Sequence, residues 1–233
     1  MKRSIFVIAA SALVLVVSSC KINNSNTTTP PVSSFAVVHA SPDAPNLNVY
    51  ANGGVVVQNF AYGSDTGYYV VQPGIYNIQM VSAATSAALV NQDVTIEPNK
   101  AYSIFAIDSL SKIKAVAVED NFTVPSSDSV RIRFLHFSPN APAVDILNGS
   151  TILFSNRNFN DQQTNAALAQ FTTIAAGTYN LEVNLAGSST SVLSLPNTVL
   201  QGGKVYTIYA KGFAGGLGTQ ALGVGTIIHN ESN

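Results

Sequence analysis

The chain has 233 residues and a formal net charge of −1; only 10 % of the residues are charged, whereas 46 % are hydrophobic. The lack of a basic excess argues against nucleic-acid binding, which depends on clustered Lys and Arg. The apolar composition argues against intrinsic disorder. The single cysteine, Cys20, has no partner for an intramolecular disulfide and excludes a cysteine-cluster metal site.

The N-terminal 20 residues have the pattern of a secretory signal. A basic start precedes an apolar run over residues 5–17, and small residues then lead to Cys20. The run is too short to span a membrane. Residues 17–20 (Val-Ser-Ser-Cys) resemble the lipobox of bacterial lipoproteins, in which the cysteine is lipidated and begins the mature protein. We predict a lipoprotein signal peptide over 1–19 and lipidation of Cys20; the alternative is an ordinary signal peptide that ends near a cysteine.

Residues 20–34 are predicted to be a flexible tether that starts at the lipidated cysteine. They are rich in Asn, Thr and Pro and show no hydrophobic period. Lys21 after the cysteine is similar to lipoproteins that pass to an outer membrane, whereas the acidic run of many surface-exported lipoproteins is missing. We expect a protein of the bacterial cell envelope, held on the outer membrane through lipid on Cys20, with the periplasmic or surface face left open.

The rest of the chain contains one unit twice. The segment 35–45 (FAVVHASPDAP) is matched by 133–142 (RFLHFSPNAP), with Pro42 and Pro139 lying 97 residues apart. The later Gly-x-Tyr patterns that end at Tyr76 and Tyr179 lie 103 residues apart. The growing offset predicts an insertion in the second copy near residues 156–168. At about a hundred residues, each copy is long enough for a domain.

Within each copy, short β-rich runs bounded by Asn, Gly and Pro alternate with a period of two, as in antiparallel sandwiches. The Ala-rich segment 81–90 could form a helical turn, but its Ser and Thr residues favour a loop or strand edge. Each Gly-x-Tyr pattern is typical of a tyrosine corner, in which the phenol bonds a nearby backbone group. We predict an all-β chain with two tandem immunoglobulin-like antiparallel β-sandwiches, at 35–122 and 128–229, joined by a short linker near 121–127. Expected strands are 48–50, 55–60, 68–71, 76–81, 94–96, 102–107, 113–118, 130–136, 152–154, 178–185, 205–211 and 221–229.

The block His-x-Ser-Pro-Asp-Ala-Pro at 39–45, followed by Leu-Asn-Val-Tyr-x-Asn-Gly at 47–53, resembles the DUF4397 family. The resemblance covers both copies, nearly all of residues 35–229. It implies an envelope domain of bacteria, often tandem and often in lipoproteins, without an established activity. The family usually has Asp where this chain has Asn48, and the second copy keeps it as Asp145; the second copy has Asn140 in place of Asp43. A site that needs either acid could therefore exist in only one copy.

The motif loops supply the first candidate site, made of His39, Asp43, His136 and Asp145. A neutral imidazole beside a carboxylate would suit a ligand or a divalent metal. The alternative is structural, because Pro and Asx residues form turns and the His ring can donate to a loop carbonyl. The structural role is favoured, since a motif present in both copies suits a requirement of the fold.

A second candidate site consists of Tyr62, Tyr68 and Tyr69, which flank the turn 63–67 and could stack on sugar rings. Tyr68 and Tyr69 are adjacent, so on a strand they must point to opposite faces. One of them should lie in the core and the other should be partly exposed. The absence of Trp counts against a glycan site, because Trp offers the largest flat apolar contact.

Some short segments match enzyme motifs, but the other residues or secondary-structure elements that those motifs require are missing. Asp65-Thr66-Gly67 matches the aspartic-protease triplet, but such enzymes need a second carboxylate and the other copy has no such triplet. The Gly216–Ala221 string matches a dinucleotide fingerprint without the required βαβ units. The three histidines have no zinc-site spacing. We predict no enzyme activity, no metal and no cofactor.

Together these features predict a lipid-anchored, non-enzymatic envelope protein. Its tandem domains would bind another envelope component or act as a surface spacer or adhesion module. The alternative is a glycan-binding lipoprotein of a polysaccharide-uptake or adhesion system. The expected partners are the membrane, reached through Cys20, and an envelope protein or glycan.

Overall fold

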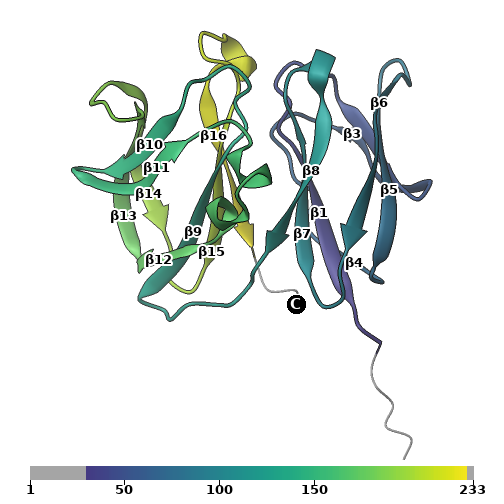
Figure 1. Ribbon diagram of the computed structural model, residues 1–233, viewed down its shortest axis with the longest axis horizontal. Coiled ribbons are helices and arrows are strands. Elements are labelled where there is room, and N and C mark those ends of the chain that lie inside the picture. Colours follow the sequence, from purple (N-terminus) through teal and green to yellow (C-terminus); the bar gives the residue numbers. More distant parts are fainter. Residues whose placement is uncertain (1–29, 230–233) are drawn as a thin grey trace, which may run out of the picture. The chain divides into compact units, whose positions relative to one another are not determined.

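A computed structural model describes residues 30–229 (Figure 1). The predicted signal peptide, Cys20 and most of the predicted tether lie outside the described residues. Residues 31–229 belong to one compact unit. From residue 30 to residue 229 the regular structure consists of β-strands and short 3₁₀ turns, without an α-helix. Over the same range, no helix has the length and apolar character needed to cross a membrane.

The first sandwich contains eight strands, which form two four-stranded sheets in the orders β4-β1-β7-β8 and β3-β2-β5-β6. The predicted strands are found, although β1 begins within the expected tether and β6 is longer than expected. The Ala-rich segment after β5 is a turn between two strands, as predicted. The strands are β1 (Ser33–His39), β2 (Leu47–Ala51), β3 (Gly54–Phe60), β4 (Tyr69–Val71), β5 (Gly74–Ser82), β6 (Ala88–Ile96), β7 (Ala101–Ile107) and β8 (Lys114–Asp120).

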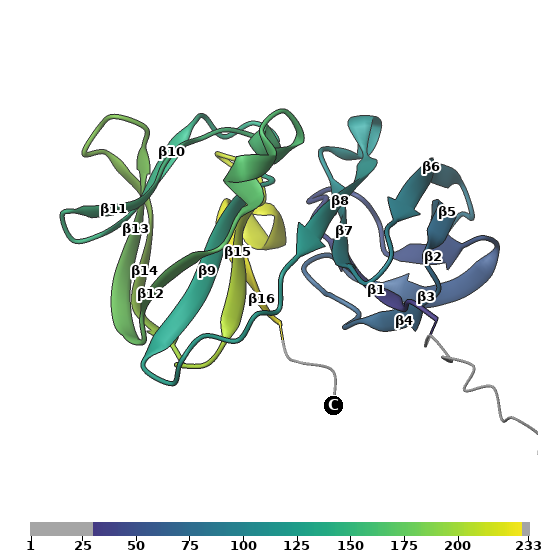
Figure 2. The same ribbon diagram turned by 60° about the horizontal axis from the view of Figure 1, so that its bottom comes forward.

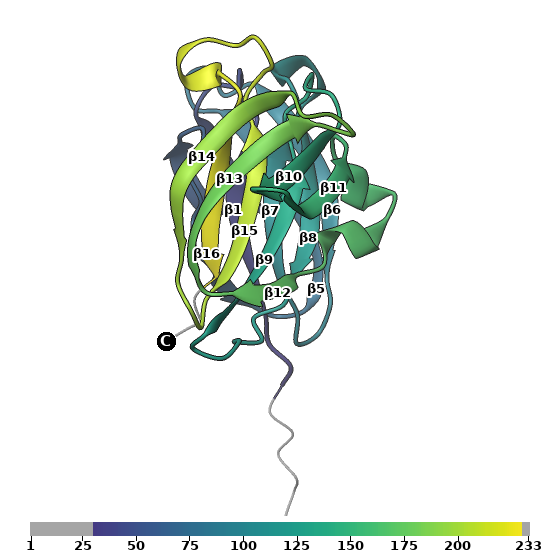
Figure 3. The same cartoon turned by 90° about the vertical axis from the view of Figure 1, so that its left-hand side faces the viewer.

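The second sandwich repeats this arrangement in the sheets β12-β9-β15-β16 and β11-β10-β13-β14 (Figure 3). Three of its strands, β10, β12 and β14, were not among the strands expected from the sequence, and β14 contains Pro196. The strand accepts this proline because it lies at the edge of its sheet. The strands are β9 (Ser129–His136), β10 (Val144–Asn148), β11 (Thr151–Arg157), β12 (Thr172–Ala175), β13 (Gly177–Leu185), β14 (Ser191–Leu200), β15 (Val205–Lys211) and β16 (Gly223–His229).

The prediction of an all-β chain with two tandem sandwiches is confirmed. The connectivity differs in detail from the seven-stranded immunoglobulin constant-type domain, whose sheets are ABED and CFG. Here the first strand of each sandwich lies between the fourth and the seventh, and pairs parallel to the seventh. Parallel pairing is possible because β1 and β7 are far apart in sequence, so no tight turn has to join them.

Both predicted tyrosine corners are present. The Tyr76 hydroxyl donates to the Gln72 carbonyl at 2.8 Å, and the Tyr179 hydroxyl donates to the Ala175 carbonyl at 2.6 Å. Each bond closes the turn that precedes β5 or β13. The Gly-x-Tyr pattern therefore marks the same corner in both copies.

The four sheets are stacked in four layers with three apolar cores between them, and the core of the second sandwich consists of two clusters that share Leu153, Phe154 and Tyr179 (Figures 1 and 2). One core fills each sandwich. The third core lies between the two sandwiches and takes residues from both halves, with Phe105 packed against Phe137 and Tyr209 at centroid distances of 4.7 and 5.7 Å. The two inner sheets are consequently covered on both faces, and every residue of β7 is buried.

The predicted insertion in the second copy is also present. It folds into two 3₁₀ turns, η2 (Asp161–Gln163) and η3 (Ala166–Ala169). Buried Arg157 holds them: its guanidinium pairs with Asp161 at 2.8–2.9 Å and donates to the Leu168 carbonyl at 3.0 Å. An internal ion pair with these additional hydrogen bonds satisfies the buried charges.

The sandwiches have two ends, which we name for what they carry. At the tether end, β1 begins at Ser33 and β16 ends at His229; Figure 1 shows both points at the bottom. At the loop end, β1 is followed by residues 40–46, and the 3₁₀ turns η1 (Leu110–Lys112) and η4 (Gly218–Gln220) lie there as well. The chain therefore enters and leaves at the same end.

Candidate functional site

The two motif histidines are fully buried and serve the loops that contain them. His39 Nε2 donates to the Pro45 carbonyl at 3.1 Å, and His136 Nε2 donates to the Pro142 carbonyl at 3.3 Å. Burial lowers the pKa of both rings, so both stay neutral at pH 7. In each ring Nδ1 is left without a hydrogen-bond partner. The geometry is that of the structural role.

The motif serines also fasten the loops. Ser41 Oγ donates to the Asp108 carbonyl and Ser138 Oγ donates to the Gly212 carbonyl, both at 2.6 Å. These carbonyls belong to the turns that follow β7 and β15. The motif thus joins the loop after the first strand to the turn after the seventh strand in both copies.

The acidic candidates are used in the same way. Asp43 Oδ1 accepts the Leu110 N–H at 2.7 Å, and its counterpart Asn140 exchanges two hydrogen bonds with the backbone of Ala214. Because an amide can close this turn as well as a carboxylate can, the Asp/Asn difference between the copies leaves the loop intact.

Asp145 is likewise committed, since it accepts the backbone N–H groups of Asn156 at 2.7 Å and Gly187 at 2.8 Å. The structure therefore does not bring His39, Asp43, His136 and Asp145 together around a common ligand. Within residues 30–229, no group of three or more His, Cys, Asp or Glu side chains is placed to hold a metal ion.

The three candidate tyrosines point in three directions. Tyr69 is 39 % exposed, whereas the Tyr68 hydroxyl points into the interface between the sandwiches. Tyr62 packs edge-on against His39 with a centroid distance of 5.9 Å, and burial raises its pKa to about 12. The rings do not form a shared stacking surface. The expected opposite orientation of Tyr68 and Tyr69 is confirmed.

A buried polar cluster crosses the interface between the sandwiches. Its centre is Arg133, whose side chain is fully buried and forms an ion pair with Asp120. Arg133 also donates to the Glu119 carbonyl at 2.8 Å and to Thr207 Oγ1 at 2.7 Å, and its guanidinium lies 4.5 Å from the centroid of the Phe171 ring. No motif in the sequence marks this cluster.

The hydrogen bonds of the cluster determine which atoms carry its protons. Tyr68 donates its single proton to Asp120 Oδ2 at 2.8 Å, so His229 Nδ1, 2.7 Å from the same hydroxyl, must be the donor to it. His229 Nε2 then accepts from Thr207 Oγ1 at 2.6 Å. This is the neutral ring, and burial accordingly lowers the pKa of His229 to about 4.

The cluster lies at positions that are equivalent in the two copies but hold different residues in each. Asp120 and His229 are the last residues of β8 and β16, and each pairs with the first residue of the neighbouring strand. Arg133 corresponds to Ala36 in the first copy. Comparing the two copies position by position is the signal that could have identified these residues, because the repeat is otherwise similar around them.

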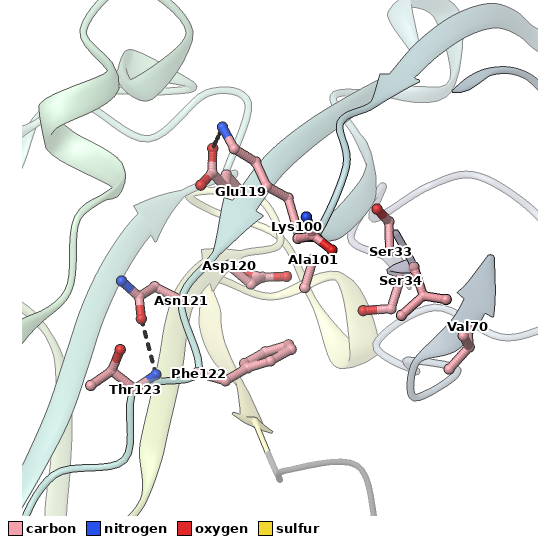
Figure 4. A pocket seen from close by; sticks show the side chains of 12 residues that line it. Ser33, Ser34, Val70, Lys100, Ala101, Glu119, Asp120, Asn121, Phe122 and Thr123 are labelled. Atoms are coloured by element: carbon pink, nitrogen blue, oxygen red, sulfur yellow. Dashed lines mark hydrogen bonds and ion pairs between the residues drawn. The ribbon is translucent and has the colours of Figure 1, made fainter. Parts of the chain in front are cut away.

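The tether end contains a cavity of about 480 Å³ near the start of β1. Figure 4 shows Val70, Lys100, Asp120 and Phe122 on its wall. Its charged groups are already paired: Lys100 Nζ lies 2.9 Å from Glu119, and Asp120 is bound to Arg133. The cavity therefore offers few free polar groups to a ligand.

The loop end contains a larger groove of about 650 Å³, which we call the loop-end groove. This volume is within the usual range of ligand sites. The groove includes one residue from each sequence-predicted set, Asp43 and Tyr62, and both sandwiches contribute to its wall. The lining residues are Pro42, Asp43, Ala44, Pro45, Tyr62, Ser82, Ala84, Thr85, Ala87, Leu89, Leu110, Thr219 and Gln220.

The model of the family DUF4397, a domain of unknown function, matches residues 33–147, from the start of β1 into β10. The resemblance found in the sequence is confirmed over these residues. No curated protein matches the chain.

Proposed function

We propose that this chain, whose residues 33–147 belong to the DUF4397 family, is a non-enzymatic protein of the bacterial cell envelope that binds another envelope component at the loop-end groove. Lipid on Cys20 would anchor it to the outer membrane. The observation that carries the proposal is the position of the groove. It lies at the end opposite to Ser33, where the chain arrives from the tether.

The rigid connection of the two sandwiches suits a protein that holds a binding groove away from its membrane anchor. A shared core and a buried ion pair join them, so they would move as one body on the tether. Both halves line the groove, and its shape therefore depends on their fixed arrangement. A rigid two-domain body with its binding groove away from the anchor suits a surface module.

The state of the motif residues supports a non-enzymatic role. His39 is buried and donates to a carbonyl, and Asp43 holds a backbone N–H. Catalytic acid–base groups need access to a substrate proton. A residue whose hydrogen bonds close a loop and whose ring is fully buried is poorly placed for that task.

Anchoring is tested by metabolic labelling with a radioactive fatty acid, comparing the full chain with Cys20→Ser. We expect label and membrane association in the first protein only. Equal labelling of both proteins, or none in either, would refute the lipid anchor.

Binding is tested with the soluble unit 31–233, in thermal melts against an envelope glycan panel and in affinity capture from solubilised envelopes. A groove variant, Leu110→Glu, is compared with Leu217→Glu on the neighbouring loop outside the groove. A partner retained by the wild type and by Leu217→Glu, and lost with Leu110→Glu, supports the proposal. A melting shift with one glycan, lost in the same variant, would assign the glycan-binding alternative. Equal binding by all three proteins would show that the groove is not the site.

A further inference from the structure

The exposed large hydrophobic side chains are concentrated at the tether end. Of the twelve found within residues 30–229, nine lie there, whereas Leu110, Val192 and Leu217 lie toward the loop end. We call the nine the tether-end ring. Single exposed apolar residues are ordinary on protein surfaces, but a concentration at one end marks an interaction site. The ring consists of Val32, Val55, Tyr69, Val70, Ile75, Val124, Ile152, Val199 and Ile228.

Strand register places these residues. β2 and β10 run toward the tether end and turn there, so Val55 and Ile152 follow the two hairpin turns. They occupy equivalent positions of the two copies and are 60 % and 54 % exposed. Val70 pairs with Ser34 at the start of β1. The apolar character of this end is therefore present in both halves.

The ring surrounds the end of the molecule rather than covering one flank. All four sheets contribute: Ile75 from β5, Val70 from β4, Ile228 from β16 and Val199 from β14 are examples. A second copy of the chain would need one contiguous apolar face to form a stable dimer. Side chains arranged around an end instead suit a flat partner that the end meets head-on.

The charges at this end are few and nearly balance, because Glu97, Glu119 and Asp128 lie there together with Lys100 and Lys204. Lys100 is paired with Glu97 at 2.6 Å and with Glu119 at 2.9 Å. The turns between the ring residues contain Asn, Gly and Pro, as at Asn52-Gly53 and Pro73-Gly74. Such turns can bond lipid headgroups while the apolar side chains reach the acyl boundary.

We propose that the tether end lies on the lipid bilayer, with the tether-end ring in the interfacial layer. The position of the anchor argues for this partner. Only eleven residues lie between Cys20 and Val32, and the chain enters the fold within the ring itself. If this segment is the flexible tether expected from its composition, its mean reach is about 20 Å. This inference rests on the proposed lipid anchor, because the anchor brings the end to the membrane.

The test uses the absence of Trp from the chain, so that one introduced Trp is the only indole fluorophore. The chain from Lys21 to Asn233 carries an N-terminal hexahistidine tag and is bound to phosphatidylethanolamine–phosphatidylglycerol vesicles that contain a nickel-chelating lipid. This attachment replaces natural lipidation, so failure of the proposed anchor and failure of membrane docking are separable. Ile75→Trp and Ile152→Trp probe the ring, and Leu217→Trp, at an 87 % exposed position of the loop end, is the matched control.

With vesicles, the emission of both ring probes should move to shorter wavelength and be quenched by brominated lipids, whereas the control should not change. Replacing Val70 and Val199 together by Ser should reduce that quenching. Equal accessibility of all three probes to water on the vesicle would overturn the proposal. A concentration-dependent shift of the ring probes without vesicles would also overturn it, because it would assign the ring to a second copy of the chain.

Discussion

Replacing Arg133 by Met should be among the most destabilising single changes in the protein. The guanidinium is fully buried, forms an ion pair with Asp120, donates to Thr207 and to the Glu119 carbonyl, and packs on Phe171. Its removal leaves the Asp120 carboxylate buried without a countercharge. Breaking a buried pair in this way costs about 3–5 kcal/mol, although Tyr68 and Ser103 would still donate to the carboxylate.

Urea unfolding of the unit 31–233 measures this loss, which should lower the transition midpoint by about 1–2 M. Arg131→Met is the matched control, because Arg131 lies on the same strand but is partly exposed, and it should cost at most about 1 kcal/mol. Adding Asp120→Asn to Arg133→Met should recover part of the loss, since no unpaired charge then stays buried. If Arg133→Met costs less than the Arg131 control, the cluster does not join the sandwiches in the way described.

Three further outcomes are expected. His229 has a pKa of about 4 in the folded protein, below its ordinary 6.5. As the pH falls, the unfolded chain therefore binds the proton first. The free energy of unfolding should decrease between pH 6.5 and pH 4, and this residue accounts for about 3 kcal/mol of the decrease. Urea midpoints at pH 7 and 4.5 should show a smaller pH effect for His229→Gln than for the wild type, and equal effects would contradict the assignment. Gly225→Ala should cost about 1–3 kcal/mol, because the new Cβ would overlap the buried Tyr209 ring. Gly223→Ala has space and should be tolerated, and thermal melts of the two variants test the difference. Tyr179→Phe should cost about 0.5–1.5 kcal/mol through loss of its corner hydrogen bond, and an unchanged melting temperature would show that the corner contributes nothing.

The two sandwiches were predictable because the repeat and the period of two can be recognised from residues that are close together in the sequence. The Gly-x-Tyr corners were predictable for the same reason, since Tyr76 bonds a carbonyl only four residues earlier. The structural role of His39 was also within reach, because its partner Pro45 belongs to the same short motif.

The interface between the sandwiches was not predictable in this way. Alternation tells which residues share a face, but β7 is apolar on both faces, so its pattern does not say what lies on each side. The continuous apolar run from Ile104 to Ile107 was nevertheless a signal of burial on both faces. Arg133 and Asp120 do not belong to a sequence motif, because they come from different sandwiches and meet only when the two sandwiches pack together. The loop-end groove depends on this docking and could not be foreseen either.

The interface also makes each half dependent on the residues of the other half. Each half presents the equivalent face to the other, yet Asp120 faces Arg133 and Ser103 corresponds to Thr207, so the halves are complementary and no longer interchangeable. Two first halves would bring two Asp120 carboxylates together without an arginine, and two second halves would bury two arginines without their acid. Neither arrangement would pair its buried charges, so this interface needs one half of each kind. Substitutions on one side of the interface will be accepted only with matching changes on the other.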